Sequence, residues 1–320
     1  MSKRTATSSN GLTVSIFQTG PEHRPEKQPV SVYKIMSVTN LPTYDEAQQA
    51  IYGIDLIPSP SPVLGKLLDS LNDPYLDAEK FEALVTKDPA LSAKILRIAN
   101  SAYYGLRAQI STIERAIVVI GIDEVKNICL TVLLSSMFSG NKIHPSFNVS
   151  QFWKHSLFVA LASKDLAGRF QVVEPETGYI LGLLHDIGRI VCATYMPHFY
   201  KKIVTLSSTK GISNFEAEQE AGLTHTQIGS WLSKKWALPY SLHAGIAYHH
   251  VPDEAKNFRM TTLLIHMADR LAYFTPTQEN KEEIKTILHK LDLSSELNVE
   301  LENCTEVWWE NVKAIWETFN

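Results

Sequence analysis

Histidine and aspartate are the side chains of this sequence best suited to chemistry, and several of them lie in segments that are expected to be buried. The adjacent pair His185-Asp186 follows a stretch, Tyr179 to Leu184, that is apolar on nearly all sides. Neutral imidazoles and carboxylates that converge from several helices can hold one or two divalent cations and leave a position open for water. The chemistry to consider is therefore divalent-metal binding, with or without hydrolysis.

The pair His185-Asp186 and His155 are expected to point inward. His155 shares one face of an amphipathic helix with apolar neighbours, and a lone histidine there would ordinarily be a core residue bonded to a carbonyl. A buried Asp186 is costly without a cation or hydrogen-bond donors, and Arg189 or backbone N–H groups are the alternative partners to a metal. Gly188 is predicted to supply the left-handed residue that ends the preceding helix.

His225 and Asp269 are less decisive when they are considered alone. Thr224 and Gln227 form a capping-box pattern, so His225 falls in the first turn of a helix, where a surface position is the simpler interpretation. Asp269 lies off the apolar stripe of its helix, which would make it a solvated acid or an ion-pair partner. That stripe consists of Met260, Leu264, Met267 and Leu271.

The second histidine pair, His249-His250, offers one inward side chain by helical geometry. Only His249 shares the face of Leu242 and Ile246. His250 is then a supporting or solvent-facing residue by this criterion.

The elements that must position these residues are predicted to be helices. Apolar residues recur at helical spacing from Pro58 onward, and Asp88-Pro89 has the cap and first-turn residues of a helix start. Gly121 separates two further helices. In the second half of the chain we predict helices at roughly 151–168, 176–185, 190–196, 225–236, 240–250 and 258–273.

Four segments follow from these patterns. Residues 1–50 form an N-terminal extension, disordered or loosely attached, in which Thr13 to Phe17 and Val30 to Val38 alternate weakly like short strands. Residues 51–140 form an N-terminal helical part, 141–275 a helical core, and 276–320 a C-terminal helical extension. Tryptophans of the last segment, such as Trp308, are expected to be core residues.

Composition excludes several classes of protein. A formal charge of −4, from 30 basic and 34 acidic residues among 320, gives no bulk attraction to nucleic acid or anionic membranes. The most hydrophobic stretch, Ala116 to Phe138, is interrupted by charges, so no membrane span is expected. Three separated cysteines form neither a disulfide framework nor a metal clip, which is typical of a cytoplasmic protein.

Two stretches of the chain resemble HDOD domains, the HD-related output domains of bacterial signalling. The first is DPALSAKILRIANSAYYG at 88–105 with ISTIERAIVVIG at 110–121, and it is similar to their N-terminal part. The second is FWKHSLFVA at 152–160 with LGLLHDIGRIV at 181–191 and the spaced histidines beyond, and it is similar to an HD core. The resemblance covers about residues 51–275.

The resemblance implies an all-α fold, a multi-helical bundle like that of HD phosphodiesterases with an N-terminal helical subdomain. It also implies divalent metal ions, Fe, Mn or Zn, in a centre with room for two of them. The ligands would be His155, His185, Asp186, His225, His249, His250 and Asp269.

HDOD proteins serve mostly in signalling without demonstrated catalysis, so the resemblance favours a regulator over an enzyme. The alternative is a metal-dependent phosphohydrolase or phosphodiesterase acting on nucleotides or cyclic dinucleotides, in which Arg189 would bind phosphate. Two departures count against the cyclic-dinucleotide branch: Arg189 replaces its lysine, and no GYP sequence follows His250. The expected partner is a signalling protein or a small phosphorylated ligand.

Overall fold

Helices make up 76% of the described chain, so the all-α fold class is confirmed. The structure, a computed structural model, describes residues 6–7, 13–14, 61–69, 77–138, 142–273, 277–294 and 297–319. Two short strands, β1 (Ala6–Thr7) and β2 (Thr13–Val14), pair antiparallel. The second of these coincides with the start of the strand expected at Thr13 to Phe17, whereas the one expected at Val30 to Val38 lies outside the described residues.

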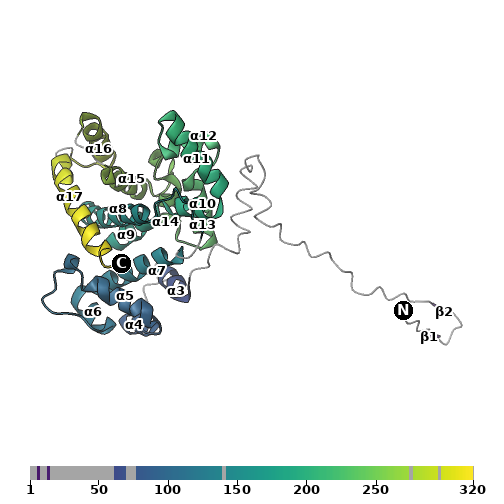
Figure 1. Cartoon of the computed structure of the whole chain (residues 1–320), viewed down its shortest axis with the longest axis vertical. Helices are drawn as coiled ribbons and strands as arrows, with labels where there is room; N and C mark the ends of the chain where they lie inside the picture. Colours follow the sequence, from purple (N-terminus) through teal and green to yellow (C-terminus); the bar gives the residue numbers. More distant parts are fainter. Residues whose placement is uncertain are drawn as a thin grey trace.

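The helices fall into an N-terminal group, a central group and two C-terminal helices (Figure 1). The N-terminal group comprises α3 (Pro62–Asp69), α4 (Ala78–Val85), α5 (Pro89–Ala99), η1 (Ala102–Tyr104), α6 (Ile113–Ile120) and α7 (Ile122–Met137). The central group comprises α8 (Val149–Phe170), α9 (Pro175–Leu184), α10 (Ile187–Tyr195), α11 (Pro197–Lys210), α12 (Asn214–Ala221), α13 (His225–Lys235), α14 (Tyr240–Tyr248), η2 (Pro252–Glu254) and α15 (Arg259–Ala272). The C-terminal helices are α16 (Gln278–Lys290) and α17 (Leu297–Trp316).

Local signals set the start and end of α5 as predicted. The Asp88 carboxylate accepts hydrogen bonds from the N–H groups of Ala90 and Leu91, and Pro89 occupies the first turn. At the other end the Asn100 side chain donates to the carbonyl of Ile110 and accepts from its N–H, at 2.8 and 2.7 Å. Asn100 therefore both ends α5 and holds the loop that leads to α6.

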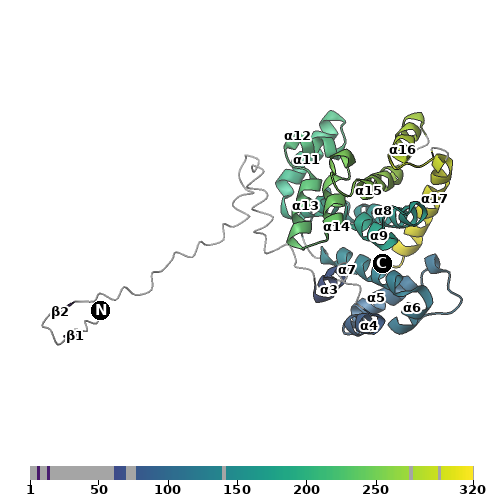
Figure 2. The ribbon, with the colours of Figure 1, turned by 180° about the vertical axis from the view of Figure 1, so that it is seen from behind.

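One hydrophobic core runs through both helical groups. Buried residues from Leu64 in α3 to Ile315 in α17 belong to a single cluster. The N-terminal group lies below the central group in Figures 1 and 2, and α17 runs along the side of α8 and down to η1. Trp308 is buried, as predicted. The segment limits at 50, 140 and 275 stay predictions.

Helices α11 and α12 are absent from the predicted set. Only Phe199 and Ile203 of α11 are buried apolar residues, so its apolar stripe is too thin to be recognised by periodicity. Helix α12 has no large apolar residue in its buried face, although the capping box of Ser213 and Glu216 marks its start.

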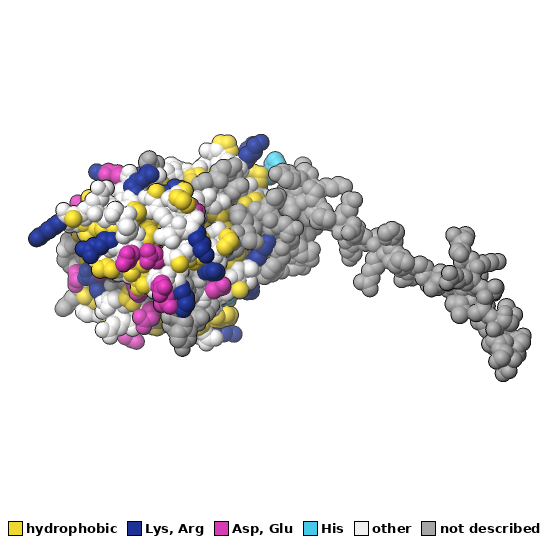
Figure 3. Space-filling view, turned by 90° about the horizontal axis from the view of Figure 1, so that it is seen from below, with side chains coloured by type: hydrophobic (Ala, Val, Ile, Leu, Met, Phe, Trp, Pro, Cys, Tyr) yellow, Lys and Arg dark blue, Asp and Glu magenta, His cyan; other side chains and the backbone are white. Residues whose placement is uncertain are grey.

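The described surface carries charges of both signs. On the face shown in Figure 3, basic, acidic and apolar side chains are intermingled. Among the described helices, none has both the length and the apolarity needed to cross a membrane. The three cysteines are unpaired, and those at 129 and 192 are buried.

Candidate metal centre

The His185-Asp186 pair lies at the junction of two helices, α9 and α10. His185 follows the last residue of α9 and Asp186 precedes the first residue of α10. Both side chains are buried, at 0% and 3% exposure. Glycine allows α9 to approach α8 closely, because a Cβ on Gly182 would lie 2.6 Å from the backbone of Ala160.

Gly188 has a different role from the one predicted. It lies in the first turn of α10 and is not in the left-handed region. A Cβ at this position would lie 2.0 Å from the carbonyl oxygen of His225. Gly188 therefore brings α10 into backbone contact with α13, and this contact places Asp186 beside His225.

Three side chains converge on one side of Asp186, and we call them, with its Oδ2 atom, group A. His155 Nε2 lies 3.3 Å from His185 Nε2 and 3.1 Å from Asp269 Oδ1. Both histidine Nε2 atoms lie 3.8 Å from Asp186 Oδ2. Donors bound about 2.1 Å from one ion are roughly 3.0 to 3.5 Å apart, so these separations are close to those of a coordination shell. Group A consists of His155, His185, Asp269 and Asp186 Oδ2.

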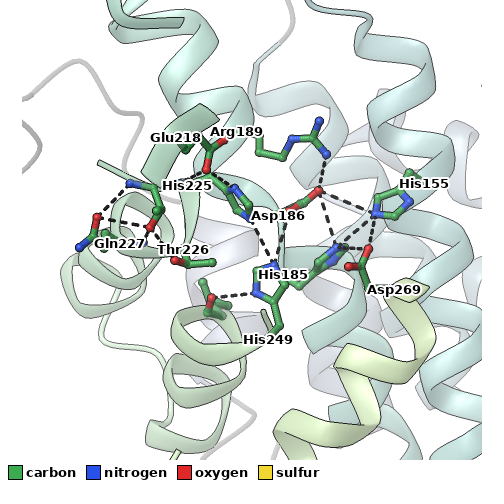
Figure 4. A network of polar contacts seen from close by, with 12 residues as sticks. His155, His185, Asp186, Arg189, Glu218, His225, Thr226, Gln227, His249 and Asp269 are labelled. Atoms are coloured by element: carbon green, nitrogen blue, oxygen red, sulfur yellow. Dashed lines mark hydrogen bonds and ion pairs between the residues drawn. The ribbon is translucent and has the colours of Figure 1, made fainter. Parts of the chain in front are cut away.

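Three histidines lie on the other side of Asp186 and, with its Oδ1 atom, form group B. Figure 4 shows two of them, His225 and His249, beside Asp186. His225 Nε2 lies 3.1 Å from Asp186 Oδ1 and 3.3 Å from His249 Nε2. His249 Nε2 lies 3.7 Å from the same oxygen. A ring nitrogen of His250 is within 4.8 Å of the other three donors. The two oxygens of Asp186 thus face two separate sets of donors.

Hydrogen bonds at the far side of the rings orient three of the histidines. His185 Nδ1 donates to the Gly182 carbonyl at 2.7 Å, and His249 Nδ1 donates to the Ile246 carbonyl at 3.0 Å. His225 Nδ1 donates to Glu218 at 2.6 Å. A donating Nδ1 leaves Nε2 to face the centre, which is the arrangement of metal-binding histidines. The donor set therefore fits divalent ions.

The charges of the centre favour the ionised form of two carboxylates. Burial favours the neutral acid, but Arg189, His185 and His225 outweigh it and hold the pKa of Asp186 well below its usual value. Burial likewise opposes ionisation of Asp269, and hydrogen bonds from the two group A histidines lower its pKa. The centre consequently carries the negative charge that a cation needs.

The protonation of His225 and His250 differs. Burial disfavours the charged form of His225, but Glu218 and Asp186 outweigh this and raise its pKa to about 10. Burial and the neighbouring His249 lower the pKa of His250. The Nε2 atoms of His225 and His249 face each other, so one of them must carry a proton to make a hydrogen bond. In the metal-free protein this proton is on His225.

All seven predicted ligands lie at the centre, but three of them lie differently from what the sequence patterns alone indicate. His225 is 4% exposed and not at the surface. Asp269 is 6% exposed rather than solvated, because α15 is buried over much more of its circumference than the Leu and Met stripe indicates. His250 is half-buried and belongs to group B instead of facing solvent. Arg189 donates to Asp186 Oδ2 at 2.8 Å.

Two residues of the site were not predicted. Glu218 of α12 is 5% exposed and accepts hydrogen bonds from both the backbone N–H and the ring of His225. Tyr273 stacks on the His155 ring, with centroids 4.9 Å apart. Glu218 looks like a solvated acid in the sequence, and only the capping box before it and the one at Thr224 indicate that two helices meet there.

Comparisons with known proteins identify the family of the chain. The family model of the HDOD domain matches residues 57–252. A crystal structure of an HDOD domain protein of unknown function from Geobacter sulfurreducens is 26% identical, with a TM-score of 0.71 over 85% of this chain and 96% of that one. The chain belongs to the HDOD domain family.

Two further relatives are more distant. A protein of Shewanella amazonensis SB2B described as a candidate phosphohydrolase is 21% identical, with a TM-score of 0.70 over 84% of this chain and 97% of that one, and shows the fold. An uncharacterized protein of Treponema pallidum is 25% identical over 226 residues, 68% of this chain. The chain matches 43% of the length of that relative.

Proposed function

We propose that this protein is a regulatory, signal-transducing member of the HDOD family whose HD-like centre binds a pair of divalent metal ions. The observation that carries the proposal is the position of Asp186 between groups A and B. Its Oδ1 faces His225 at 3.1 Å, and its Oδ2 faces both His155 and His185 at 3.8 Å. A carboxylate with two such sets of partners is suited to bridge two ions.

Limited access to the centre supports a regulator more than an efficient enzyme. The group A and B residues are 0–6% exposed apart from His250. Arg189 occupies Asp186 Oδ2, and Tyr273 covers the ring of His155. A partner would then bind at the surface of the protein. We propose that this partner is a signalling protein or a small phosphorylated ligand in the cytoplasm.

Hydrolysis of a phosphate ester is the second candidate function. A cavity of about 350 Å³ has His250, His266 and Lys290 in its lining. When bound, divalent ions would act as Lewis acids toward a phosphoryl group. Arg189, whose side chain is 26% exposed, would hold a phosphate oxygen beside Asp186.

Metal analysis of the purified protein tests the proposal. Protein reconstituted separately with iron, manganese and zinc and then desalted is expected to retain ions, and Asp186→Asn to retain far fewer because both groups lose their shared oxygen charge. Asp165→Asn, which changes a surface carboxylate on α8, is the matched control. Wild-type protein without bound ion after all three reconstitutions would contradict the metal centre.

A substrate screen then separates the two candidate functions. We expect phosphomonoesters, nucleotides and cyclic dinucleotides to be turned over slowly or not at all by the metal-loaded protein. Rapid turnover that is lost in His185→Ala would favour the phosphohydrolase over the regulator.

A further inference from the structure

The charged residues next to groups A and B have opposite signs. On the side of group A, Arg189 Nη1 lies 2.8 Å from Asp186 Oδ2. On the side of group B, the Glu218 carboxylate lies 2.6 Å from His225 Nδ1. Neither residue is itself a member of either group. The two halves of one centre therefore differ in how strongly they attract a cation.

Arg189 weakens group A in two ways. Its guanidinium takes up hydrogen-bonding capacity of the oxygen that an ion in group A would share. It also places a full positive charge next to the position of that ion, where burial makes like charges repel strongly. Group A therefore reaches its full affinity for an ion only when Arg189 moves away from Asp186.

Tyr273 holds Arg189 in this place. Its ring is stacked on His155 at 27° between the ring planes, and its hydroxyl interacts with the Arg189 side chain. The tyrosine is 57% exposed, so it lies at the boundary between the centre and solvent. Tyr273 therefore contacts both a ligand of group A and Arg189.

Glu218 strengthens group B. A carboxylate that accepts a hydrogen bond from the far nitrogen of a histidine increases the electron density at the facing nitrogen, which makes the histidine a better ligand. Glu218 also accepts from the backbone N–H of His225 at 2.8 Å, so its position is fixed by two bonds. It contributes a buried negative charge behind a ligand of group B. Group A holds a buried carboxylate of its own, Asp269, but there the positive charge of Arg189 opposes it.

We infer that the two positions fill in order: group B takes the first divalent ion, and Arg189 makes group A a weak second position. The inference rests on the proposed metal centre and adds an order and a cause to it. Arg189 is then a positioning residue that controls the number of ions bound.

Titration with Mn(II), followed by the electron paramagnetic resonance signal of the free ion, measures both affinities. In the wild type we expect two binding steps at least tenfold apart. His249→Ala is expected to remove the tight step, and Asp269→Asn only the weak one. The spectrum of the bound ions adds a second measurement, because two neighbouring Mn(II) ions couple and one does not.

Substitutions of Arg189 test the cause. Arg189→Gln is expected to tighten the second step at least tenfold and to leave the first nearly unchanged. Arg189→Lys keeps the charge and should keep the two steps apart. The matched control is Arg169→Gln, which removes an arginine paired with Asp165 and Glu300 on the surface of α8.

The outcomes distinguish this inference from the metal centre itself. If the wild type binds no ion, the metal centre is wrong. If it binds two ions with equal affinity, or if Arg189→Gln leaves the separation unchanged, the metal centre stands and the ordered filling is wrong. Should Arg189→Gln not fold, Tyr273→Leu, at a half-exposed position, is expected to narrow the separation in the same direction, and an unchanged separation there would overturn the inference.

Discussion

At the scale of single residues, the histidines of the centre are oriented before any ion arrives. Backbone carbonyls accept from Nδ1 of His185 and His249, and a carbonyl can only accept, so these rings carry their proton on the far side. In the neutral form of either ring, Nε2 is then a bare acceptor that faces its neighbours. The arrangement is unfavourable without a positive charge between the rings, and a proton or a metal ion supplies it.

The raised pKa of His225 predicts that metal binding releases a proton. At pH 7.5 the ring is charged in the metal-free protein because its pKa lies at about 10, and an ion in group B must displace that proton. We expect about one proton per first ion, measured calorimetrically in buffers of different ionisation enthalpy. Below pH 10 the apparent affinity should rise as pH rises, by up to about tenfold per pH unit.

Glu218→Gln should reduce both the proton release and the pH dependence of the metal affinity, because a neutral glutamine no longer stabilises the charged form of His225. The exposed neighbour Glu220 provides the control as Glu220→Gln. In the metal-free wild type, the charged His225 stabilises the fold fully below its unfolded pKa of about 6.5, and this contribution is lost as pH rises through 10. A metal-free protein that is equally stable at pH 6.5 and 10 in the wild type and in Glu218→Gln would contradict this assignment.

At the scale of helices, backbone contacts set the positions of the ligands. Gly182 brings α9 onto α8, and Gly188 brings α10 onto α13. Side chains on those faces would separate the helices and move His185 and Asp186 away from His155 and His225. The geometry of the centre therefore depends on small residues that have no chemistry of their own.

Gly188→Ala is expected to destabilise the protein by about 3 kcal/mol or more and to weaken metal binding, because the new methyl overlaps the His225 carbonyl. Urea unfolding and metal retention measure the two effects. Gly65→Ala is the control: a Cβ on Gly65 of α3 meets nothing within 4 Å, and alanine should stabilise that helix by about 0.5 to 1 kcal/mol. Equal stabilities for the two variants would contradict the role of Gly188.

The sequence allowed the helices with strong apolar stripes to be predicted, and the capping residues at 88 and 224 fixed where two of them start. The prediction of burial failed for residues that are covered by helices distant in the sequence. Asp269 is buried by neighbours on all sides of α15, and Glu218 by the meeting of α12 with α13. Gly188 was taken for a helix end because close packing between distant backbones leaves no local pattern.

At the scale of the whole molecule, α17 connects the N-terminal and central helical groups by packing against both. It packs along α8 and also contacts η1 of the N-terminal group. Trp308 is 4% exposed, packs edge-on against Phe158 at 5.8 Å and donates to Asp165 at 3.2 Å. The residues matched by the HDOD family end at 252, so this fastening lies outside the matched region.

Trp308→Ala is expected to lower the free energy of unfolding by about 3 to 5 kcal/mol, since it leaves a large cavity beside α8. Chemical denaturation gives the value, and limited proteolysis should show faster cleavage within α17. Its neighbour Val307, 52% exposed, serves as the control, and Val307→Ala should change stability by less than about 0.5 kcal/mol. If both variants unfold alike, α17 does not fasten the two groups.

The position of α17 in the chain also has a consequence for biosynthesis. Phe158 is fully buried, but Trp308 and Trp309, which cover it, are made 150 residues later. At translation rates of about 5 to 20 residues per second, this apolar face of α8 stays uncovered for roughly 8 to 30 s. During that interval the nascent chain offers an apolar surface to chaperones and to other nascent chains, and the arrival of α17 ends it.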